Sequence, residues 1–154
     1  MNNNISVVLL GAGKSNRLKN KNIKQNLIIN KKRIIDYSRD FFSKYFKDSK
    51  IYLAINKKVI IKKRKKNEHI IIGSSSRVKS LFCAMKYIYD NNLQTEYILI
   101  HDVARPVLNI KNINSLINSI KPGIDGSSLG YPLTNAIKEV GSEHISYSIH
   151  KENL

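Results

Sequence analysis

The sequence lacks the residues on which several common classes of protein depend. It contains one cysteine, Cys83, so neither an internal disulfide nor a cysteine metal cluster can form, and we expect a reducing compartment. No apolar run approaches the length of a membrane span, which predicts no association with a membrane. The first apolar run begins at Ile5, so we expect no signal or transit peptide and a location in the cytoplasm.

Acidic residues are also scarce, with 11 Asp and Glu against 27 Lys and Arg and a net charge of +16. Such a surplus can serve nucleic acid, an anionic membrane or anionic small substrates. The chain is crowded with Lys, Asn and Ile, so we expect compositional drift to explain most of the charge. The lysine-rich residues 57–66, a short helix or an irregular loop, have no interleaved aromatics. We interpret them as a solvated charge run and predict no nucleic-acid partner.

Only 3 prolines and 7 glycines punctuate the 154 residues, and no repeat or linker is evident, which predicts a single domain of residues 1–154. Apolar runs predict strands at residues 5–10, 51–55, 70–72, 97–100, 127–133 and 136–140, and an extended arm at 145–149. Between them, helical spacing predicts three helices. The first covers residues 34–46, the second begins after an N-cap at Ser76, and the third covers residues 113–120. This order predicts an α/β fold with a mostly parallel sheet and helices on both faces.

The first predicted strand runs into a loop of small residues, Gly11, Ala12 and Gly13, and two cations follow at Arg17 and Lys24. In an open α/β sheet, ligands bind at the carboxyl edge, where such a loop exposes its backbone N–H groups. Bare N–H groups beside an arginine and a lysine favour a polyphosphate.

Other interpretations of this loop fit less well or remain open. A dinucleotide motif needs a third glycine where Asn16 stands, and a P-loop would place its first glycine at Val8, inside the strand. A plain strand-to-helix turn with solvated lysines stays open on these residues alone.

The pattern L-x-G-A-G-x-x-x-R, followed by K-Q, resembles the signature of the 2-C-methyl-D-erythritol 4-phosphate cytidylyltransferase family of the non-mevalonate isoprenoid pathway. The resemblance runs from Val7 to Leu154 and implies a three-layer α/β/α, Rossmann-like nucleotidyltransferase fold, with a β-arm near the C-terminus. It implies that the loop of Gly11 cradles phosphate, and that Arg17 and Lys24 are catalytic cations.

Residues 73–80, GSSSRVKS, resemble the segment G-G-x-x-R-x-x-S-V that holds the cytosine base in the family. This implies nucleotide-binding roles for Gly73, Ser74, Ser75 and Ser80. Ser74 replaces the second glycine and Ser75 replaces the usual acidic residue.

Residues 101–106, HDVARP, resemble the family's H-D-A-A-R-P and differ only at Val103. The resemblance implies that Asp102 binds the ribose or a Mg²⁺ ion on the triphosphate, and that Arg105 grips a phosphate of the substrate. A capped turn at the strand end is the alternative without a ligand.

Two later segments resemble the acceptor side of the family's site. Residues 130–138 resemble P-x-x-D-T-x-K, with Asn135 and Ala136 in place of the substrate-binding aspartate and threonine. Residues 148–154 resemble the dimer arm T-V-D-R-x-x-L, with Lys151 in place of an arginine that reaches the partner subunit. The resemblance therefore implies a homodimer through residues 145–154.

The implied activity joins CTP to 2-C-methyl-D-erythritol 4-phosphate, a sugar-alcohol phosphate, with Mg²⁺ as cofactor. A ribitol-5-phosphate cytidylyltransferase, a catalytically weakened nucleotide-binding homologue and a basic nucleic-acid binder are the alternatives. The family pattern continues beyond Leu154 with segments that orient the acceptor. We therefore expect the chain to lack the C-terminal part of the family domain, and to bind CTP but turn it over poorly.

Overall fold

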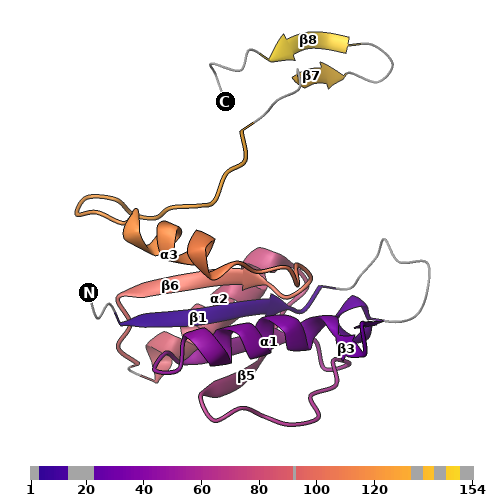
Figure 1. Ribbon diagram of the computed structural model, residues 1–154, viewed down its shortest axis with the longest axis vertical. Helices are drawn as coiled ribbons and strands as arrows, with labels where there is room; N and C mark the ends of the chain where they lie inside the picture. The colour runs from indigo at the N-terminus through magenta and orange to yellow at the C-terminus, as the bar shows by residue number, and fades with distance from the viewer. Residues whose placement is uncertain (1–3, 14–22, 92, 133–136, 141–144, 150–154) are drawn as a thin grey trace. The chain divides into compact units, whose positions relative to one another are not determined.

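The structure is a computed structural model that describes residues 4–13, 23–91, 93–132, 137–140 and 145–149 (Figure 1). Its contacts divide the chain into two compact units, Met1–Leu108 and Asn109–Leu154. The interpretation of residues 1–154 as one domain stays a prediction. Within the described ranges, no helix is both long and apolar enough to cross a membrane.

The first unit is built on a sheet of four parallel strands in the order β5-β4-β1-β6. These strands are β1 (Ile5–Gly11), β4 (Ile51–Ile55), β5 (Glu68–Ile72) and β6 (Tyr97–Asp102). All the residues of β4 are buried, as are six of the seven in β1, which explains their unbroken apolar runs. The four strands predicted for this unit are confirmed.

Two helices cover opposite faces of this sheet. The connection from β1 to β4 contains α1 (Ile34–Tyr45), and the connection from β5 to β6 contains α2 (Arg77–Asp90). These connections run in opposite directions across the sheet, so right-handed crossovers place the helices on opposite faces. Figure 1 shows α1 in front of the sheet and α2 behind it. The predicted α/β architecture, with helices on both faces, is confirmed.

The core beneath α2 follows from the alternation of side chains along the strands. Val8 and Leu10 of β1 point to the same face, where they join residues of β4, β5 and α2. The complete buried cluster comprises Val8, Leu10, Tyr52, Ala54, Ile71, Ala84 and Ile88.

A short hairpin lies between β1 and α1. A single 3-10 turn, η1 (Lys24–Asn26), leads into β2 (Ile28–Ile29) and β3 (Lys32–Arg33). Asn30 and Lys31 both have positive φ, 48° and 64°, as a two-residue type I′ turn requires. Residues 57–66 contain no helix or strand, so the irregular loop was the correct alternative.

The second unit contains α3 (Ile110–Asn118) and an antiparallel hairpin of β7 (Ile137–Val140) and β8 (Ile145–Ile149). The Asn109 side chain caps α3 by accepting a hydrogen bond of 2.9 Å from the Lys111 N–H. The strand predicted at residues 127–133 is wrong over its described part, because residues 127–132 are irregular and exposed. Pro132 offers no N–H to a ladder, and no described strand pairs with this segment.

Candidate functional site

The carboxyl ends of the four strands meet at one edge of the sheet. Gly11 is in register with Ile55, Ile55 with Ile72, and Leu10 with Asp102. The loops that follow β1, β5 and β6 therefore leave the sheet at the same edge. They are the three loops in which the sequence predicted a nucleotide site, and this edge is where open α/β sheets bind ligands.

Two glycines allow these loops to approach one another closely. A Cβ atom on Gly11 would lie 2.9 Å from Cγ2 of the fully buried Val103. A Cβ atom on Gly73 would lie 2.4 Å from the Cβ of Ala12, a short side chain that cannot turn away. A side chain at either position would collide with a neighbour, so glycine lets the loop after β5 approach Ala12 and lets the end of β1 approach Val103.

The loop after β5 is shaped by the hydroxyl of Ser80, which is 2% exposed. Ser80 Oγ accepts a hydrogen bond of 3.0 Å from the Ser74 N–H and lies 2.7 Å from the Ser76 carbonyl oxygen, to which it donates. Ser76 Oγ in turn accepts from the Lys79 N–H and caps α2, as predicted. In this structure Ser80 therefore holds the loop, while Ser75 is exposed on it. Contact of these residues with a base stays a prediction.

Asp102 links two loops whose strands are not neighbours. Its Oδ1 lies 3.1 Å from Nε of Arg77, at the start of α2, and its Oδ2 lies 3.8 Å from Nε of Arg105. Strands β4 and β1 separate β5 from β6, so the Arg77–Asp102 pair spans the middle of the edge. Sequence reasoning gave Arg77 no role, although its place in the GSSSRVKS segment was the signal that could have found it.

His101 stabilises the same strand end from within. Its Nε2 lies 3.1 Å from the Arg105 carbonyl oxygen, and its ring centroid lies 5.5 Å from that of Phe42 in α1. Burial, together with the charge of Arg105, lowers the pKa of His101, although the bond to the Arg105 carbonyl and the Asp102 carboxylate act in the opposite direction. The imidazole is therefore kept neutral near pH 7.

Of the predicted catalytic residues, the structure describes Lys24. It is exposed in η1 and precedes Gln25, which is 4% exposed. The Gln25 Nε2 atom lies 3.4 Å from the Gly13 carbonyl oxygen, so the turn that carries Lys24 is tied to the loop of Gly11 to Gly13. Other predicted site residues lie outside the described residues, namely Arg17, Asn135, Ala136 and Lys151.

The donor groups at this edge suit a metal ion that arrives with its substrate. Among the described residues, no group of three or more His, Cys, Asp or Glu side chains could hold an ion. Of the described carboxylates, that of Asp102 lies at this edge, where it is partly exposed and paired with Arg77 and Arg105. Mg²⁺ commonly takes one or two protein carboxylates and completes its coordination with phosphate oxygens and water, so a single aspartate is sufficient.

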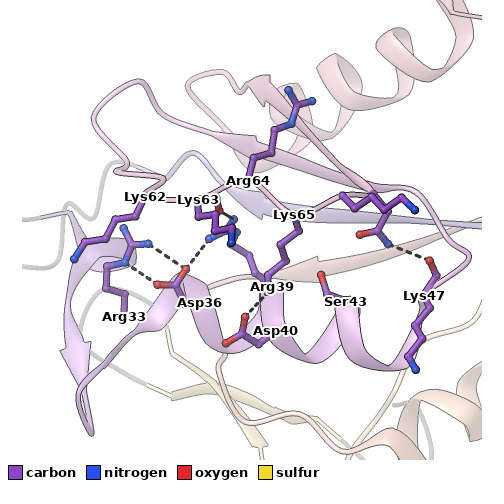
Figure 2. Close-up of a pocket in the computed structure, with 12 residues that line it drawn as sticks. Arg33, Asp36, Arg39, Asp40, Ser43, Lys47, Lys62, Lys63, Arg64 and Lys65 are labelled. Atoms are coloured by element: carbon purple, nitrogen blue, oxygen red, sulfur yellow. Dashed lines mark hydrogen bonds and ion pairs between the residues drawn. The ribbon is translucent and has the colours of Figure 1, made fainter.

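A separate groove of about 690 Å³ lies between α1 and residues 62–67, in a different part of the unit (Figure 2). Its carboxylates are already paired. Asp36 lies 2.7 Å from both Arg33 and Arg39, and Asp40 lies 2.5 Å from Lys65. The lining is strongly basic and contains no aromatic residue; it comprises Arg33, Asp36, Arg39, Asp40, Ser43, Lys47, Lys62, Lys63, Arg64, Lys65, Lys66 and Asn67.

The fold and the edge together define a class of protein. A parallel sheet with glycine-tight loops, two arginines and an aspartate at its carboxyl edge is the architecture of a nucleotide-binding α/β protein. The family model of 2-C-methyl-D-erythritol 4-phosphate cytidylyltransferase (IspD) matches residues 5–154, and the chain belongs to this family.

Individual relatives agree with this assignment. The 2-C-methyl-D-erythritol 4-phosphate cytidylyltransferase of Wigglesworthia glossinidia brevipalpis is 31% identical over 157 residues, which cover 97% of this chain and 66% of the relative. A bifunctional enzyme IspD/IspF of Pelagibacter ubique is also 31% identical, over 92% of this chain and 40% of its own length. The chain thus spans less than two thirds of either relative.

Solved structures show the same fold. The crystal structure of the Francisella tularensis 2-C-methyl-D-erythritol 4-phosphate cytidylyltransferase matches with a TM-score of 0.78 at 22% identity, over 98% of this chain and 68% of that one. A 4-diphosphocytidyl-2C-methyl-D-erythritol synthase matches with a TM-score of 0.79 at 17% identity, over 100% of this chain and 71% of that one. The fold is therefore that of an IspD-like nucleotidyltransferase.

Proposed function

We propose that this chain transfers a cytidylyl group from CTP to 2-C-methyl-D-erythritol 4-phosphate, forming a CDP-sugar alcohol and pyrophosphate. One observation carries the proposal beyond the family assignment. The three predicted nucleotide loops lie at a single edge of the sheet, where the Arg77–Asp102 pair and the contact of Gly73 with Ala12 join them. A nucleoside triphosphate contacts such loops at its base, ribose and phosphates together.

The reaction is a displacement at phosphorus. An oxygen of the acceptor phosphate attacks the α-phosphorus of CTP in line, and the bond from that phosphorus to the oxygen bridging to the β-phosphate breaks. The electron pair leaves with pyrophosphate. No covalent bond to the protein is needed, so catalysis consists of positioning the two substrates and neutralising the charge that develops.

The nucleotide half of the site uses residues at the described edge. Backbone N–H groups of the loop from Gly11 to Gly13 receive the phosphates, as a loop of small residues allows. The loop of Gly73 and Ser80 faces the base, and Asp102 faces the ribose or a Mg²⁺ ion. When bound, Mg²⁺ would neutralise phosphate charge, with Asp102 as its protein ligand.

The remaining roles fall to cations and to the acceptor side. Arg17 and Lys24 stabilise charge on the transferring and leaving phosphates. Arg105, with Asn135 and Ala136, binds the acceptor, and Lys151 from the second chain of a homodimer positions its phosphate. The β7–β8 hairpin, which leads into residues 150–154, supports an arm of this kind.

Parallel turnover assays test the proposal. The chain is incubated with CTP and Mg²⁺, and pyrophosphate release is followed with 2-C-methyl-D-erythritol 4-phosphate or ribitol 5-phosphate as acceptor. We expect release with the first acceptor to exceed release with the second. Faster release with ribitol 5-phosphate would reassign the acceptor, and CTP binding without release from either would leave a nucleotide-binding homologue.

A further inference from the structure

The 3-10 turn η1, which carries Lys24, is tied to its surroundings by the two side chains after the lysine. Gln25 reaches the Gly13 carbonyl oxygen over 3.4 Å, as described above. Asn26 Nδ2 donates to the Lys58 carbonyl oxygen over 3.2 Å, and Asn26 Oδ1 accepts from the Ile60 N–H, also over 3.2 Å. The turn is therefore held on one side by the phosphate loop and on the other by the segment after β4.

The Asn26 side-chain amide can hold η1 against the segment after β4 because its nitrogen donates one hydrogen bond and its oxygen accepts another. Its donor and its acceptor meet two backbone groups of one segment, Lys58 and Ile60, and an alanine at this position would lose both bonds. Turn geometry alone does not supply this anchor. Among the described residues, the backbone of η1 makes local bonds, from Asn26 N to Ile23 O and from Leu27 N to Lys24 O.

The placement of η1 limits the positions that the Lys24 ammonium can reach. The flexible stem of a lysine lets the ammonium sample many positions, so the backbone sets the region that it can reach. A loss of about 1 Å in placement can lower a rate by about a hundredfold. The anchor of η1 therefore bears directly on where the Lys24 ammonium meets phosphate.

We propose that Asn26, supported by Gln25, is a positioning residue that places Lys24 against the phosphates of CTP. The inference rests on the proposed function, in which Lys24 contacts those phosphates. Nothing in the sequence marks Asn26 as more than a surface amide, because its two backbone partners lie 32 and 34 residues away along the chain.

Asn67 provides a matched control. Its Nδ2 donates to the Ser49 carbonyl oxygen over 2.8 Å, so it too fastens one loop to another through an amide. It lies beside the amino ends of β4 and β5, the opposite edge of the sheet from Lys24. Asn67→Ala should cost stability of the same kind and leave Lys24 in place.

The first measurement does not depend on turnover. The unmodified chain, Asn26→Ala, Asn26→Asp and Asn67→Ala are lightly acetylated with and without saturating CTP, and acetylation of Lys24 is read by mass spectrometry. We expect CTP to protect Lys24 in the unmodified chain and in Asn67→Ala. Protection should fall about tenfold in Asn26→Ala, the effect of losing two hydrogen bonds of ordinary strength. Asn26→Asp keeps the acceptor for the Ile60 N–H and should fall between.

The second measurement is a double-mutant cycle in turnover. Asn26→Ala should lower kcat about tenfold with little change in KM for CTP, and should have no further effect in a Lys24→Ala background, because it acts through Lys24. Equal effects in both backgrounds, or equal protection of Lys24 in Asn26→Ala and Asn67→Ala, would overturn the inference. If the unmodified chain turns over CTP and Asn26→Ala has the same kcat and the same protection of Lys24, this inference fails and the proposed function stands. If the unmodified chain does not bind CTP, the proposed function fails and the inference with it.

Discussion

Lys24 is the predicted catalytic cation whose surroundings the structure describes, and its role can be separated from simple binding. It stands exposed in η1, one residue before the buried Gln25. Its backbone therefore has a fixed place, and its exposed side chain is accessible to a substrate phosphate. Such a group acts mainly on charge that develops during the reaction.

Replacing Lys24 by alanine should therefore lower the rate far more than the affinity. Loss of a contact made chiefly in the transition state typically costs about 3 kcal/mol, or a hundredfold or more in kcat. We expect Lys24→Ala to show this loss in steady-state kinetics, while CTP affinity by calorimetry changes little. Equal losses in affinity and in kcat would make Lys24 a ground-state binding residue instead.

His101 and His69 give the stability of the fold a pH dependence. Burial lowers the pKa of both, aided by the charge of Arg105 at His101 and of Arg64 and Lys50 at His69. In the unfolded chain a histidine takes up its proton near pH 6.5, before the folded protein can do so. The free energy of unfolding should therefore fall as the pH drops below about 6.5, because the unfolded state binds more protons.

Urea denaturation at several pH values between 7 and 5 measures this dependence. His101→Phe keeps an aromatic ring against Phe42 and removes one titrating group, so its unfolding free energy should depend less steeply on pH. A slope in the variant as steep as in the unmodified chain would show that His101 does not contribute.

At the scale of elements, a buried ion pair joins α1 to β5. Nε and Nη2 of Arg39 each lie 2.7 Å from an oxygen of Glu68, and the two side chains are 4% and 0% exposed. Arg39 also contacts Asp36 and donates to the Lys63 carbonyl oxygen, which brings the irregular loop against the helix (Figure 2). The ion pair therefore holds the amino end of the edge strand β5 against α1.

Breaking this pair from one side should be severe. Arg39→Met would leave the carboxylate of Glu68 buried without its partner, which typically costs about 3–5 kcal/mol. Replacing both residues, in Arg39→Met with Glu68→Leu, removes the uncompensated charge and should recover most of that loss. Chemical denaturation of the three proteins checks the order, and a double variant no more stable than Arg39→Met would contradict it.

The sequence predicted what depends on local pattern. Unbroken apolar runs gave β1 and β4, and the serine before α2 gave its N-cap. It missed what depends on distant pairing. Arg39 falls on the buried face of its helix, and only the partner 29 residues later explains why a charge is tolerated there. The strand predicted at residues 127–133 is wrong over residues 127–132, because an apolar pattern does not show whether a partner strand lies beside it, and none of the described strands does.

The candidate site, too, has features that the sequence predicted and features that it missed. The three loops were located by the apolar runs that precede them, while their nucleotide-binding roles came from the resemblance to the cytidylyltransferase family and stay predictions. The Arg77–Asp102 pair and the Asn26 bonds required the sheet order, which brings the ends of separated strands together.

At the scale of the whole molecule, the net charge of +16 is the feature most open to misinterpretation. The basic groove of Figure 2 contains no aromatic side chain on which a base could stack, and arginine and lysine partners already neutralise its carboxylates. We expect duplex DNA to bind less tightly than CTP at physiological ionic strength, as measured by fluorescence anisotropy at several salt concentrations. A tighter, strongly salt-dependent complex with DNA would assign the charge to nucleic acid.

We propose that the edge formed by the loops after β1, β5 and β6 is a site for CTP. Calorimetric titration of the chain with CTP in the presence of Mg²⁺ tests this claim directly, with ATP as the matched nucleotide and Gly73→Val as the matched variant. A valine at this position cannot fit against Ala12, so it forces two of the loops apart. We predict one CTP per chain, weaker binding of ATP, and loss of CTP binding in a variant that stays folded by circular dichroism. Equal binding of CTP and ATP, or undiminished CTP binding by folded Gly73→Val, would contradict the account.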